Sequence, residues 1–565
     1  MGGISLRFVW GDPVTVLSHW TSWKTTLLRR APILGALGLT LALGLYERLL
    51  LPLNPAEFAD RFSPLGQVLV QAASAAAVAF FFWGAFSSRG AVRWVYGVIF
   101  VAGLLTEHGY IYAMGRFSRV QDYYLGLFGV DVYVLKNAFS AYLGLRWTTL
   151  LPVGVFLALL VLTRRFRAGG WRRLGAVLAG MTALFALLYP FSQGTFPAVS
   201  VGASWRTLTF AGVKWATTYH GPRESLPVMQ EDSLGPNVVF IVDESIRCDH
   251  LSLNGYARPT TPYLEIQQTE GKLTNWGCAS SAATASMLAN TLLSTGVHTF
   301  PDPTQAVYRK PNLFQYARAA GYETYLVDGQ LDKPWFLTRS EMRWVDHWKR
   351  ARDFTRPPMY GIDPQIAQYL RQELRGASGK FFWVNKMGVH IPYSDHYPPA
   401  SALWLPASAD YLLPPKRQPE LVNAYDNGLA YNLDGFFQEL LADGALDNTI
   451  IIYTSDHGQT LAENGETWPH NANTPNEARV PLFILHSGAL QADTRYPASH
   501  FNLFATALDA LGVPEDLRRY PYAPSLFTAR LGDPTFRYYM DNLPDDHSDG
   551  ELYWLDPVPT PIPQP

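Results

Sequence analysis

The chain has little charge and very little cysteine. Only 16% of its 565 residues are charged, against about 25% in average soluble proteins. The shortage is uneven, because residues 1–195 carry 17 Lys and Arg but only 7 Asp and Glu, whereas the later residues carry 28 and 40. This pattern excludes a uniform soluble protein, a disordered chain and a collagen-like chain. We expect no nucleic-acid partner either, since the excess positive charge lies between apolar stretches.

The two cysteines, Cys248 and Cys278, are too few for a disulfide scaffold or a cysteine-based zinc module. They can pair or remain reduced, and we expect two buried free thiols. The oligomeric state is not readable from the sequence.

The first third of the chain holds what the rest lacks, long apolar stretches. Crossing a bilayer takes about 20 apolar residues, and these stretches are candidate spans whose exact ends are loosely defined. One of them lies between Arg61 and Arg89, which enclose 27 residues without a charge. The other four stretches cover residues 32–46, 94–106, 147–163 and 174–190. We therefore predict an α-helical membrane domain with five transmembrane helices over residues 1–191.

The loops between these stretches predict an orientation. Residues 164–173, RRFRAGGWRR, contain five arginines and no acid, and Arg89 and Arg93 occupy an earlier loop. Basic loops stay in the cytoplasm, so everything after residue 191 is expected outside. Residues 116–146 are too polar to span and are expected to lie on the membrane surface as an amphipathic segment.

Glu107 follows the third apolar stretch. Acids within a membrane are costly and usually functional. The alternative is a hydrated carboxylate at the outer interface.

The pattern changes after the apolar third. Residues 192–235 mix Gly, Pro, Ser and charge, which predicts a linker. From residue 236 onward short apolar runs alternate with helix-like segments, which predicts an α/β domain with a mainly parallel central sheet over residues 236–565. The runs are 237–242, 323–327, 380–384, 449–454 and 480–485.

Carboxylates and imidazoles follow several of these runs. Glu244 comes after the first run, Asp456 and His457 after the fourth, and His390 after the third. In open α/β sheets ligands bind beyond the carboxyl ends of the strands, and these side chains are suitable zinc ligands. Each of them alone also fits a helix cap or a salt bridge.

The segment CASSAATASMLANTLLSTG (278–296) contains a candidate nucleophile. Small polar residues lead into an apolar helical stretch, and Thr284 is expected near the start of that helix, where an anion such as phosphate is favoured. A threonine hydroxyl is a poor nucleophile unless a metal ion activates it. The alternative is a simple helix cap.

Five motifs of the chain stand out together. They are NVVFIVDESIRCDHLSLNGYARPTTPYL (237–264), SAATASMLANTL (281–292), GVHIPY (388–393), TSDHGQTLAENG (454–465) and WPHNANTPNEARVPLFI (468–484). Together they resemble those of the phosphoethanolamine transferases. These enzymes are membrane-anchored members of the alkaline phosphatase and sulfatase superfamily and include those behind polymyxin and colistin resistance. The resemblance implies a sulfatase-like catalytic domain in the periplasm and a multi-pass anchor in the bacterial inner membrane.

The resemblance also implies roles for single residues. Thr284 matches the threonine that binds zinc and accepts phosphoethanolamine as a covalent phosphothreonine intermediate. One firm zinc site is implied, with room for a second, weaker one. The residues that match the zinc ligands are Glu244, Thr284, Asp456 and His457. The residues expected to bind substrate are His390, His470, Lys333 and Glu107.

The implied reaction transfers phosphoethanolamine from phosphatidylethanolamine to lipid A, the lipopolysaccharide core or another envelope glycan. One alternative is a glycerol phosphate transferase of the lipoteichoic-acid-synthase type, which usually uses manganese. Another is a non-catalytic membrane-anchored protein that keeps the fold. A sulfatase is disfavoured, because Cys278 lacks the C-x-P-x-R pattern of those enzymes. The chain departs from the transferases at Asp243, where the family usually has Gly, and this adds a charge beside the expected metal.

Overall fold

The computed structural model divides the chain into two compact units, Met1–Ala216 and Thr217–Pro565. Each unit is considered by itself. The structure describes residues 13–50, 64–114, 147–165, 170–188, 200–217, 219, 221–227, 229, 235–298, 303–331, 337, 341–354, 358–407, 417–442, 447–463, 474–488, 490–540 and 552–558.

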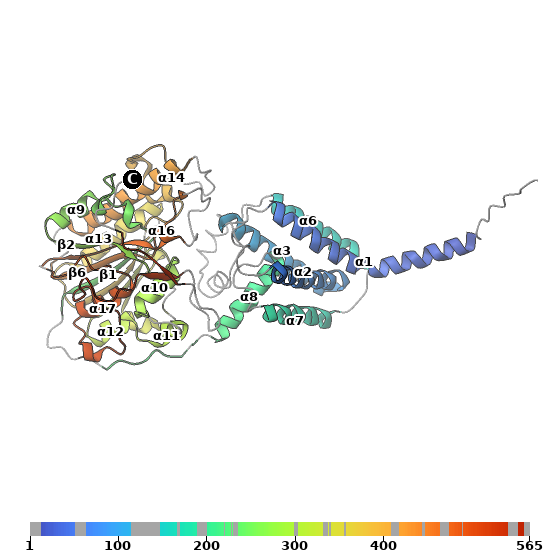
Figure 1. Cartoon of the computed structure of the whole chain (residues 1–565), viewed down its shortest axis with the longest axis horizontal. Helices are drawn as coiled ribbons and strands as arrows, with labels where there is room; N and C mark the ends of the chain where they lie inside the picture. The colour runs from blue at the N-terminus through green and yellow to red at the C-terminus, as the bar shows by residue number, and fades with distance from the viewer. Residues whose placement is uncertain are drawn as a thin grey trace, which may run out of the picture. The chain divides into compact units, whose positions relative to one another are not determined.

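The described part of the first unit is helical, and each of the five predicted apolar stretches overlaps a helix (Figure 1). The expected surface segment 116–146 lies outside the described residues. A sixth helix, α8, follows in the segment predicted to be a linker. The helices are α1 (Pro13–Leu50), α2 (Pro64–Ser87), α3 (Gly90–Met114), α6 (Trp147–Leu162), α7 (Trp171–Leu188) and α8 (Ser200–Thr217).

Two stretches among the described residues are long and apolar enough to be candidate membrane spans, Ala31–Leu49 in α1 and Gly90–Gly109 in α3. The apolar parts of α2 and α6, Gln71–Ser87 and Thr148–Leu162, are shorter than the roughly 20 residues that a bilayer requires. The predicted number of five spans therefore stays a prediction.

Helix α8 differs from the linker expected over 192–235. The small residues Gly, Ser and Thr that suggested a connector instead permit close packing of helices. Ser204 Oγ donates to the Gly103 carbonyl of α3 at 3.0 Å, and a Cβ atom added at Gly103 would lie 3.5 Å from Ser204 Cβ. Small polar residues thus serve as a helix-packing surface here.

Many large apolar side chains of the first unit are exposed, including Leu41 and Leu162, at 72% and 71%. Exposed apolar patches of this kind indicate contact with lipid or with another protein. The described helices of this unit contain only two carboxylates, Glu47 and Glu107. Both lie near the ends of their helices, at the same end of the bundle, because His108 contacts Glu47.

The opposite end of the first unit is basic. The buried Arg93 guanidinium donates to the carbonyls of Phe86 at 2.7 Å and Leu160 at 2.6 Å, near the ends of α2 and α6. A cation stabilises the carbonyl end of a helix, where the last C=O groups lack partners. The first unit therefore has an acidic end and a basic end.

The second unit contains a seven-stranded sheet of order β2-β7-β6-β1-β5-β3-β4. All five predicted runs are strands, and the mainly parallel sheet is confirmed. Strand β7 runs antiparallel to β6 and β2, while β6, β1, β5, β3 and β4 are parallel. The strands are β1 (Asn237–Asp243), β2 (Leu273–Ser280), β3 (Glu323–Asp328), β4 (His347–Lys349), β5 (Lys380–Asn385), β6 (Thr449–Ser455) and β7 (Arg479–His486).

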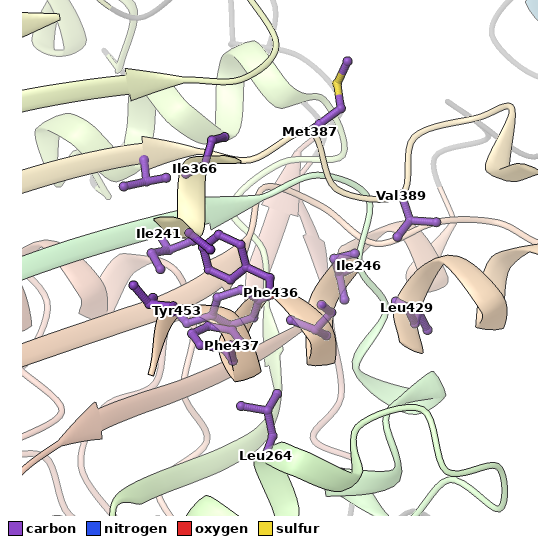
Figure 2. Packing of buried hydrophobic residues seen from close by; sticks show 14 of the residues in the cluster. Ile241, Ile246, Leu264, Ile366, Met387, Val389, Leu429, Phe436, Phe437 and Tyr453 are labelled. Atoms are coloured by element: carbon purple, nitrogen blue, oxygen red, sulfur yellow. The ribbon is translucent and has the colours of Figure 1, made fainter. Parts of the chain in front are cut away.

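Helices cover both faces of this sheet (Figure 1). Alternate residues of β1 point to opposite faces, so Ile241 packs with Phe436 and Phe437 (Figure 2) whereas Phe240 packs with Trp383 on the other side. The first face carries α9 (Pro262–Thr269), α13 (Ile362–Leu374), α14 (Gln418–Leu429) and α15 (Gly435–Leu440). The second face carries α12 (Leu313–Ala319) and α17 (Phe501–Ala510).

Further helices and two strands belong to the described part of the second unit. A two-stranded sheet joins β8 and β9. These elements are α10 (Ser286–Thr295), α11 (Pro303–Arg309), α16 (Pro475–Ala478), β8 (Tyr538–Met540) and β9 (Leu552–Trp554).

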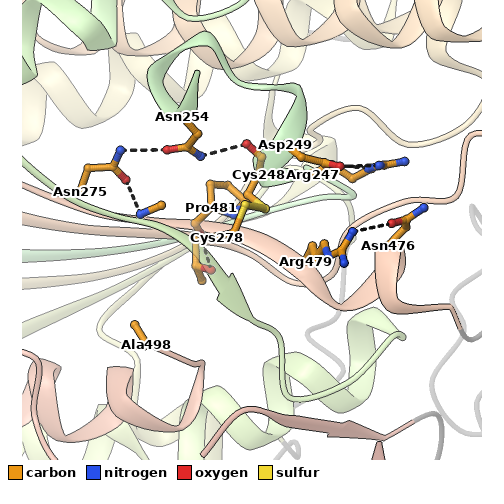
Figure 3. Close-up of a disulfide and its surroundings, with 12 residues drawn as sticks. Arg247, Cys248, Asp249, Asn254, Asn275, Cys278, Asn476, Arg479, Pro481 and Ala498 are labelled. Atoms are coloured by element: carbon orange, nitrogen blue, oxygen red, sulfur yellow. Dashed lines mark hydrogen bonds and ion pairs between the residues drawn. A yellow bond between two sulfur atoms is a disulfide. The ribbon is translucent and has the colours of Figure 1, made fainter. Parts of the chain in front are cut away.

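The expectation of two free thiols is wrong, because Cys248 and Cys278 form a disulfide (Figure 3). Cys248 lies in the loop after β1, Cys278 lies in β2, and their Cα atoms are 5.2 Å apart. Such a separation suits a disulfide. The bond joins the loop that follows Glu244 to the strand that leads to Thr284.

Replacing both cysteines (Cys248→Ala with Cys278→Ala) should lower the free energy of unfolding by about 3 kcal/mol, since the bond closes a loop of moderate length. Chemical denaturation of the full chain in detergent, followed by tryptophan fluorescence, measures the change. Reductant should destabilise the wild type and leave the double variant unchanged. Equal stability of the two proteins without reductant would contradict the presence of the bond.

Candidate metal centre

Two neighbouring parallel strands bring Glu244, Asp456 and His457 together. Asp243 at the end of β1 pairs with Ser455 at the end of β6, so the residues that follow each strand lie level. One ligand atom from each of the three side chains lies within 4.8 Å of the others, and all three are buried. Two carboxylates and one imidazole are a suitable donor set for a divalent transition metal such as zinc.

Hydrogen bonds orient these three side chains toward one another. His457 Nδ1 contacts the Gly458 carbonyl at 2.6 Å, and because a carbonyl only accepts, Nδ1 carries the proton. The other ring nitrogen, Nε2, faces Asp456 Oδ2 at 3.5 Å and Glu244 Oε1 at 3.6 Å. A backbone carbonyl behind the ring is the usual support for a metal-binding histidine.

One carboxylate oxygen of Asp456 accepts hydrogen bonds from the backbone, and the other accepts none. Its Oδ1 accepts from the backbone N–H groups of Ser245 at 3.1 Å and of His457 at 2.6 Å. Its Oδ2 is buried and has no hydrogen-bond partner. A buried carboxylate oxygen without a donor is costly, and a cation between Oδ2, Glu244 and His457 Nε2 removes that cost.

The electrostatics of the cluster also favour a bound cation. Burial, together with the charge of Glu244, raises the pKa of Asp456 to about 7. Burial by itself lowers the pKa of His457, but the charges of Asp456 and Glu244 outweigh it and the pKa is raised. Two carboxylates this close repel each other, and a bound divalent cation reverses the effect by favouring the deprotonated ligands.

The hydroxyl that contacts the cluster belongs to Ser286, which the sequence reasoning missed. Ser286 Oγ lies 3.2 Å from Glu244 Oε2 and 3.3 Å from His457 Nε2. Thr284 is buried, and its hydroxyl makes no hydrogen bond to the three side chains of the cluster, all of which the structure describes. Ala285 lies between the two residues, with φ −135° and ψ 132°, and α10 begins at Ser286.

Backbone contacts hold the segment before Ser286 in place. His500 Nδ1 accepts from the Ala282 N–H at 3.2 Å, and the Met540 carbonyl accepts from the Thr284 N–H at 3.1 Å. Burial lowers the pKa of His500 to about 3, so this imidazole is neutral. Its Nε2 then donates to Thr454 Oγ1 at 3.0 Å. The Thr284 backbone is therefore fixed between β8 and the start of α17.

Asp243 is not part of the ligand cluster, although a charge beside the metal was expected there. Its Oδ2 lies 2.5 Å from the Lys386 ammonium and accepts from Tyr453 at 2.8 Å, while Oδ1 accepts from the Glu244 N–H at 2.9 Å. Lys386 is completely buried and also lies 3.6 Å from Asp363. Lysine thus compensates the added charge and leaves Asp243 to hold the Glu244 backbone.

Gly388 is required beside the ligands. Its φ of +59° favours glycine. A Cβ atom there would lie 2.5 Å from the Glu244 carbonyl oxygen and 2.6 Å from Asp243 Oδ1. The loop after β5 can therefore approach the Glu244 backbone, and it brings His390 toward the cluster.

The remaining predicted site residues lie in different parts of the chain, and two of them are not described by the structure. His390 lies in that loop, its Nδ1 donates to the Ile391 carbonyl at 2.7 Å, and burial followed by the charge of His457 lowers its pKa. His470 and Lys333 lie outside the described residues. Glu107 lies in the first unit, fully buried in α3.

The residue that follows Glu107 has polar surroundings. This residue, His108, contacts Glu47 Oε1 and Thr149 Oγ1, each at 3.3 Å. Glu47 in turn accepts from the Ser200 N–H at the start of α8, with the shorter contact at 2.8 Å. Four helices therefore contribute to a buried polar cluster at the acidic end of the first unit.

Three contributing residues were missed from the sequence, Ser286, Lys386 and His500. The segment predicted to hold the nucleophile contained a signal for the first, since Ser286 lies two residues after Thr284. Lys386 was visible after the run 380–384, next to the segment that holds His390. His500 had no such signal, because it comes from a distant loop.

The Sulfatase family profile matches residues 236–513. Two relatives from Escherichia coli illustrate the similarity. Kdo(2)-lipid A phosphoethanolamine 7''-transferase of strain K12 is 24% identical over 295 residues, which is 49% of this chain and 51% of that protein. Phosphatidylethanolamine transferase Mcr-1 is 26% identical over 283 residues, 47% of this chain and 51% of that protein. The matched region spans about half the length of these relatives.

A solved structure shares the two-part fold. It is the integral membrane protein lipooligosaccharide phosphoethanolamine transferase A from Neisseria meningitidis, which is 18% identical and superposes with a TM-score of 0.54. The superposition covers 84% of this chain and 95% of that one. The helical unit and the sheet unit of this chain thus occur together in a known fold.

Metal binding should weaken as the pH falls through about 7. The pKa of Asp456 is raised to about 7, so below this pH a proton occupies the carboxylate and competes with the cation. Competition between the full chain and a chromophoric chelator for Zn²⁺, from pH 8 to 5.5, measures the affinity. The Asp456→Asn variant should bind weakly throughout. An affinity that stays constant across this range would contradict the assignment.

Replacing Lys386 with Met should lower the free energy of unfolding by about 3–5 kcal/mol, because it leaves Asp243 and Asp363 buried without a counter-ion. Chemical denaturation measures the loss. The matched control is Lys272→Met, which removes a half-exposed partner of Glu270 and should change stability far less, because solvent screens an exposed ion pair. Equal effects of the two substitutions would show that the buried pair carries no special weight.

Proposed function

We propose that this chain, which belongs to the phosphoethanolamine transferase family, transfers phosphoethanolamine from phosphatidylethanolamine to an acceptor in the bacterial cell envelope. Candidate acceptors are lipid A, the lipopolysaccharide core and another envelope glycan. The observation that carries the proposal is the buried cluster of Glu244, Asp456 and His457 beside the hydroxyl-bearing segment before α10. The proposed transferred group and the proposed lipid donor are inferred from the relatives, which are named as transferases of phosphoethanolamine and phosphatidylethanolamine.

Zinc fits the cluster best, because its donors are two carboxylates and one imidazole and because Asp456 Oδ2 is buried without a partner. Glu244, Asp456 and His457 would hold the ion, and Thr284 would be the fourth ligand. When bound, zinc lowers the pKa of a neighbouring hydroxyl and offsets negative charge at phosphorus. One site is proposed, and a second would lie toward His390.

Thr284 is the proposed nucleophile. Its Oγ forms a bond to the phosphorus of phosphatidylethanolamine, the bond from phosphorus to the diacylglycerol oxygen breaks, and the proton of the hydroxyl ends on diacylglycerol. A hydroxyl or phosphate oxygen of the acceptor then forms a bond to phosphorus, and the bond from phosphorus to Thr284 Oγ breaks. Thr284 regains its hydroxyl by taking up the proton that an acceptor hydroxyl releases or, for a phosphate acceptor, a proton from solvent. Contacts of the Ala282 and Thr284 backbone N–H groups with His500 and Met540 support this role, since they hold the nucleophile in one position.

His390 is proposed to bind the transferred group. Its Nδ1 donates to a carbonyl, so in the neutral ring Nε2 accepts, which suits the ammonium or the leaving proton. His470 and Lys333, which lie outside the described residues, are proposed to bind the substrate. Ser286, which donates to Glu244 Oε2, is proposed to position that ligand.

The first unit is proposed to anchor the enzyme in the inner membrane with five spans and with the second unit in the periplasm. The disulfide supports an oxidising compartment for the second unit. Within the first unit, Glu107 is proposed to attract the ammonium of the donor at the acidic end of the helices, beside the pair of Glu47 and His108. Donor and diacylglycerol both reside in the bilayer, which explains an anchor of this size.

Replacing Thr284 with Ala should abolish the covalent adduct and reduce transfer by at least about 10³-fold. Incubation of the purified full chain with phosphatidylethanolamine, followed by intact-protein mass spectrometry, should show one added phosphoethanolamine on the wild type. The matched control is Thr291→Ala, because the Thr291 hydroxyl bonds within α10 at 2.7 Å to the Met287 carbonyl and its loss should leave the adduct intact.

Two other outcomes would overturn parts of this proposal. An adduct that persists in Thr284→Ala but disappears in Ser286→Ala would make Ser286 the nucleophile. An added phosphoglycerol in place of phosphoethanolamine would identify a glycerol phosphate transferase. Lipid mass spectrometry of cells with and without the protein identifies the acceptor.

A further inference from the structure

An open apolar groove lies between α2 and α7 at the basic end of the first unit. Its volume is about 310 Å³, and its lining is almost entirely apolar. Helix α7 contributes residues spaced three and four apart, from Arg173 through Val177 and Gly180 to Leu184, while α2 contributes Ala77 and Trp83. This spacing places the lining of α7 on one face of the helix.

A single cation stands at one end of this groove. The Arg173 guanidinium lies 4.6 Å from the centre of the Trp83 ring, an arrangement that a cation and an aromatic face favour. No ion pair of Arg173 with a carboxylate is present among the described residues. The described acids of this unit, Glu47 and Glu107, lie at the opposite end of the helices. Arg173 therefore has positive charge to offer to a ligand.

The dimensions of the groove match one leaflet of a bilayer. Arg173 and Leu184 are eleven residues apart, which is about 16 Å along a helix axis, and half of the hydrocarbon core is about 15 Å thick. Trp171 at the start of α7 is 66% exposed, as expected for a side chain at the level of the lipid head groups. Arg173 thus lies where lipid phosphates lie, and Leu184 lies near the bilayer centre.

We propose that this groove binds a phospholipid with a net negative head group, with its phosphate on Arg173 and one acyl chain along α7. A zwitterionic head group fits less well, because this end of the unit offers no described carboxylate to an ammonium. Arg164 and Arg172 on the same end add positive charge. Basic pockets between membrane helices favour anionic lipids for these reasons. The site is separate from the proposed transfer reaction and depends only on residence in a membrane.

Gly180 gives access to the groove for a test. A Cβ atom added there would meet no heavy atom within 4 Å, so a side chain can start at this position and occupy space in the groove. Gly175 is a matched control, since a Cβ atom there is equally free but Gly175 is not among the residues that line the groove. Arg172 is exposed on the same turn as Arg173 and is the control for charge.

The test is native mass spectrometry of the full chain in detergent, titrated with short-chain phosphatidylglycerol or phosphatidylcholine. The wild type should bind phosphatidylglycerol about five- to tenfold more tightly than phosphatidylcholine. Arg173→Gln should remove this preference, and Gly180→Trp should reduce binding of both lipids. Arg172→Gln and Gly175→Trp should bind as the wild type does.

Three results would overturn the proposal. Equal binding of the two lipids to the wild type would remove the role of charge. Binding of phosphatidylglycerol to Arg173→Gln as tightly as to the wild type would exclude Arg173, and undiminished binding to Gly180→Trp would exclude the groove. Loss of the phosphothreonine adduct in the transfer experiment leaves this lipid test unaffected, so failure of the two proposals is distinguishable.

Discussion

The structure depends on one electrostatic constraint, the close approach of two buried carboxylates at the ends of neighbouring parallel strands. Glu244 and Asp456 come after β1 and β6, and His457 faces both of them. Without a cation, burial and the charge of Glu244 raise the pKa of Asp456 to about 7. The Oδ2 atom of Asp456 is then buried with no hydrogen-bond donor. The surrounding hydrogen bonds keep these groups in place, so the two carboxylates are positioned for a cation whose charge the other side chains of the cluster do not supply.

An ion pair and a disulfide hold the backbone around this cluster. Lys386 neutralises Asp243, whose other oxygen holds the Glu244 backbone. The disulfide ties the Glu244 loop to β2, and β2 leads to the segment of Thr284 and Ser286. The disulfide thus links the proposed metal ligands to the proposed nucleophile segment, and phosphoryl transfer requires such fixed positions.

The sequence predicted what depends on local pattern and missed what depends on packing. The alternation of apolar runs with helix-like segments was sufficient to predict five of the seven strands of the large sheet. The polar residues after those runs were sufficient to predict that Glu244, Asp456 and His457 converge. Strands β2 and β4 were not predicted, because β4 has only three residues and β2 contains a glycine and small polar residues that carry no strand pattern. The pairing of Cys248 with Cys278 depends on how β2 lies beside the loop after β1, which spacing does not reveal. The close packing that makes α8 a helix is a tertiary effect of the same kind.

The most direct test of the account is X-ray absorption at the zinc edge on the purified full chain. The account predicts one ion with nitrogen and oxygen ligands at about 2.0–2.2 Å, and loss of that ion in Asp456→Asn and His457→Ala. A wild-type protein saturated with zinc that shows sulfur ligands, or the same spectrum in both variants, would contradict the assignment of Glu244, Asp456 and His457 as the metal centre.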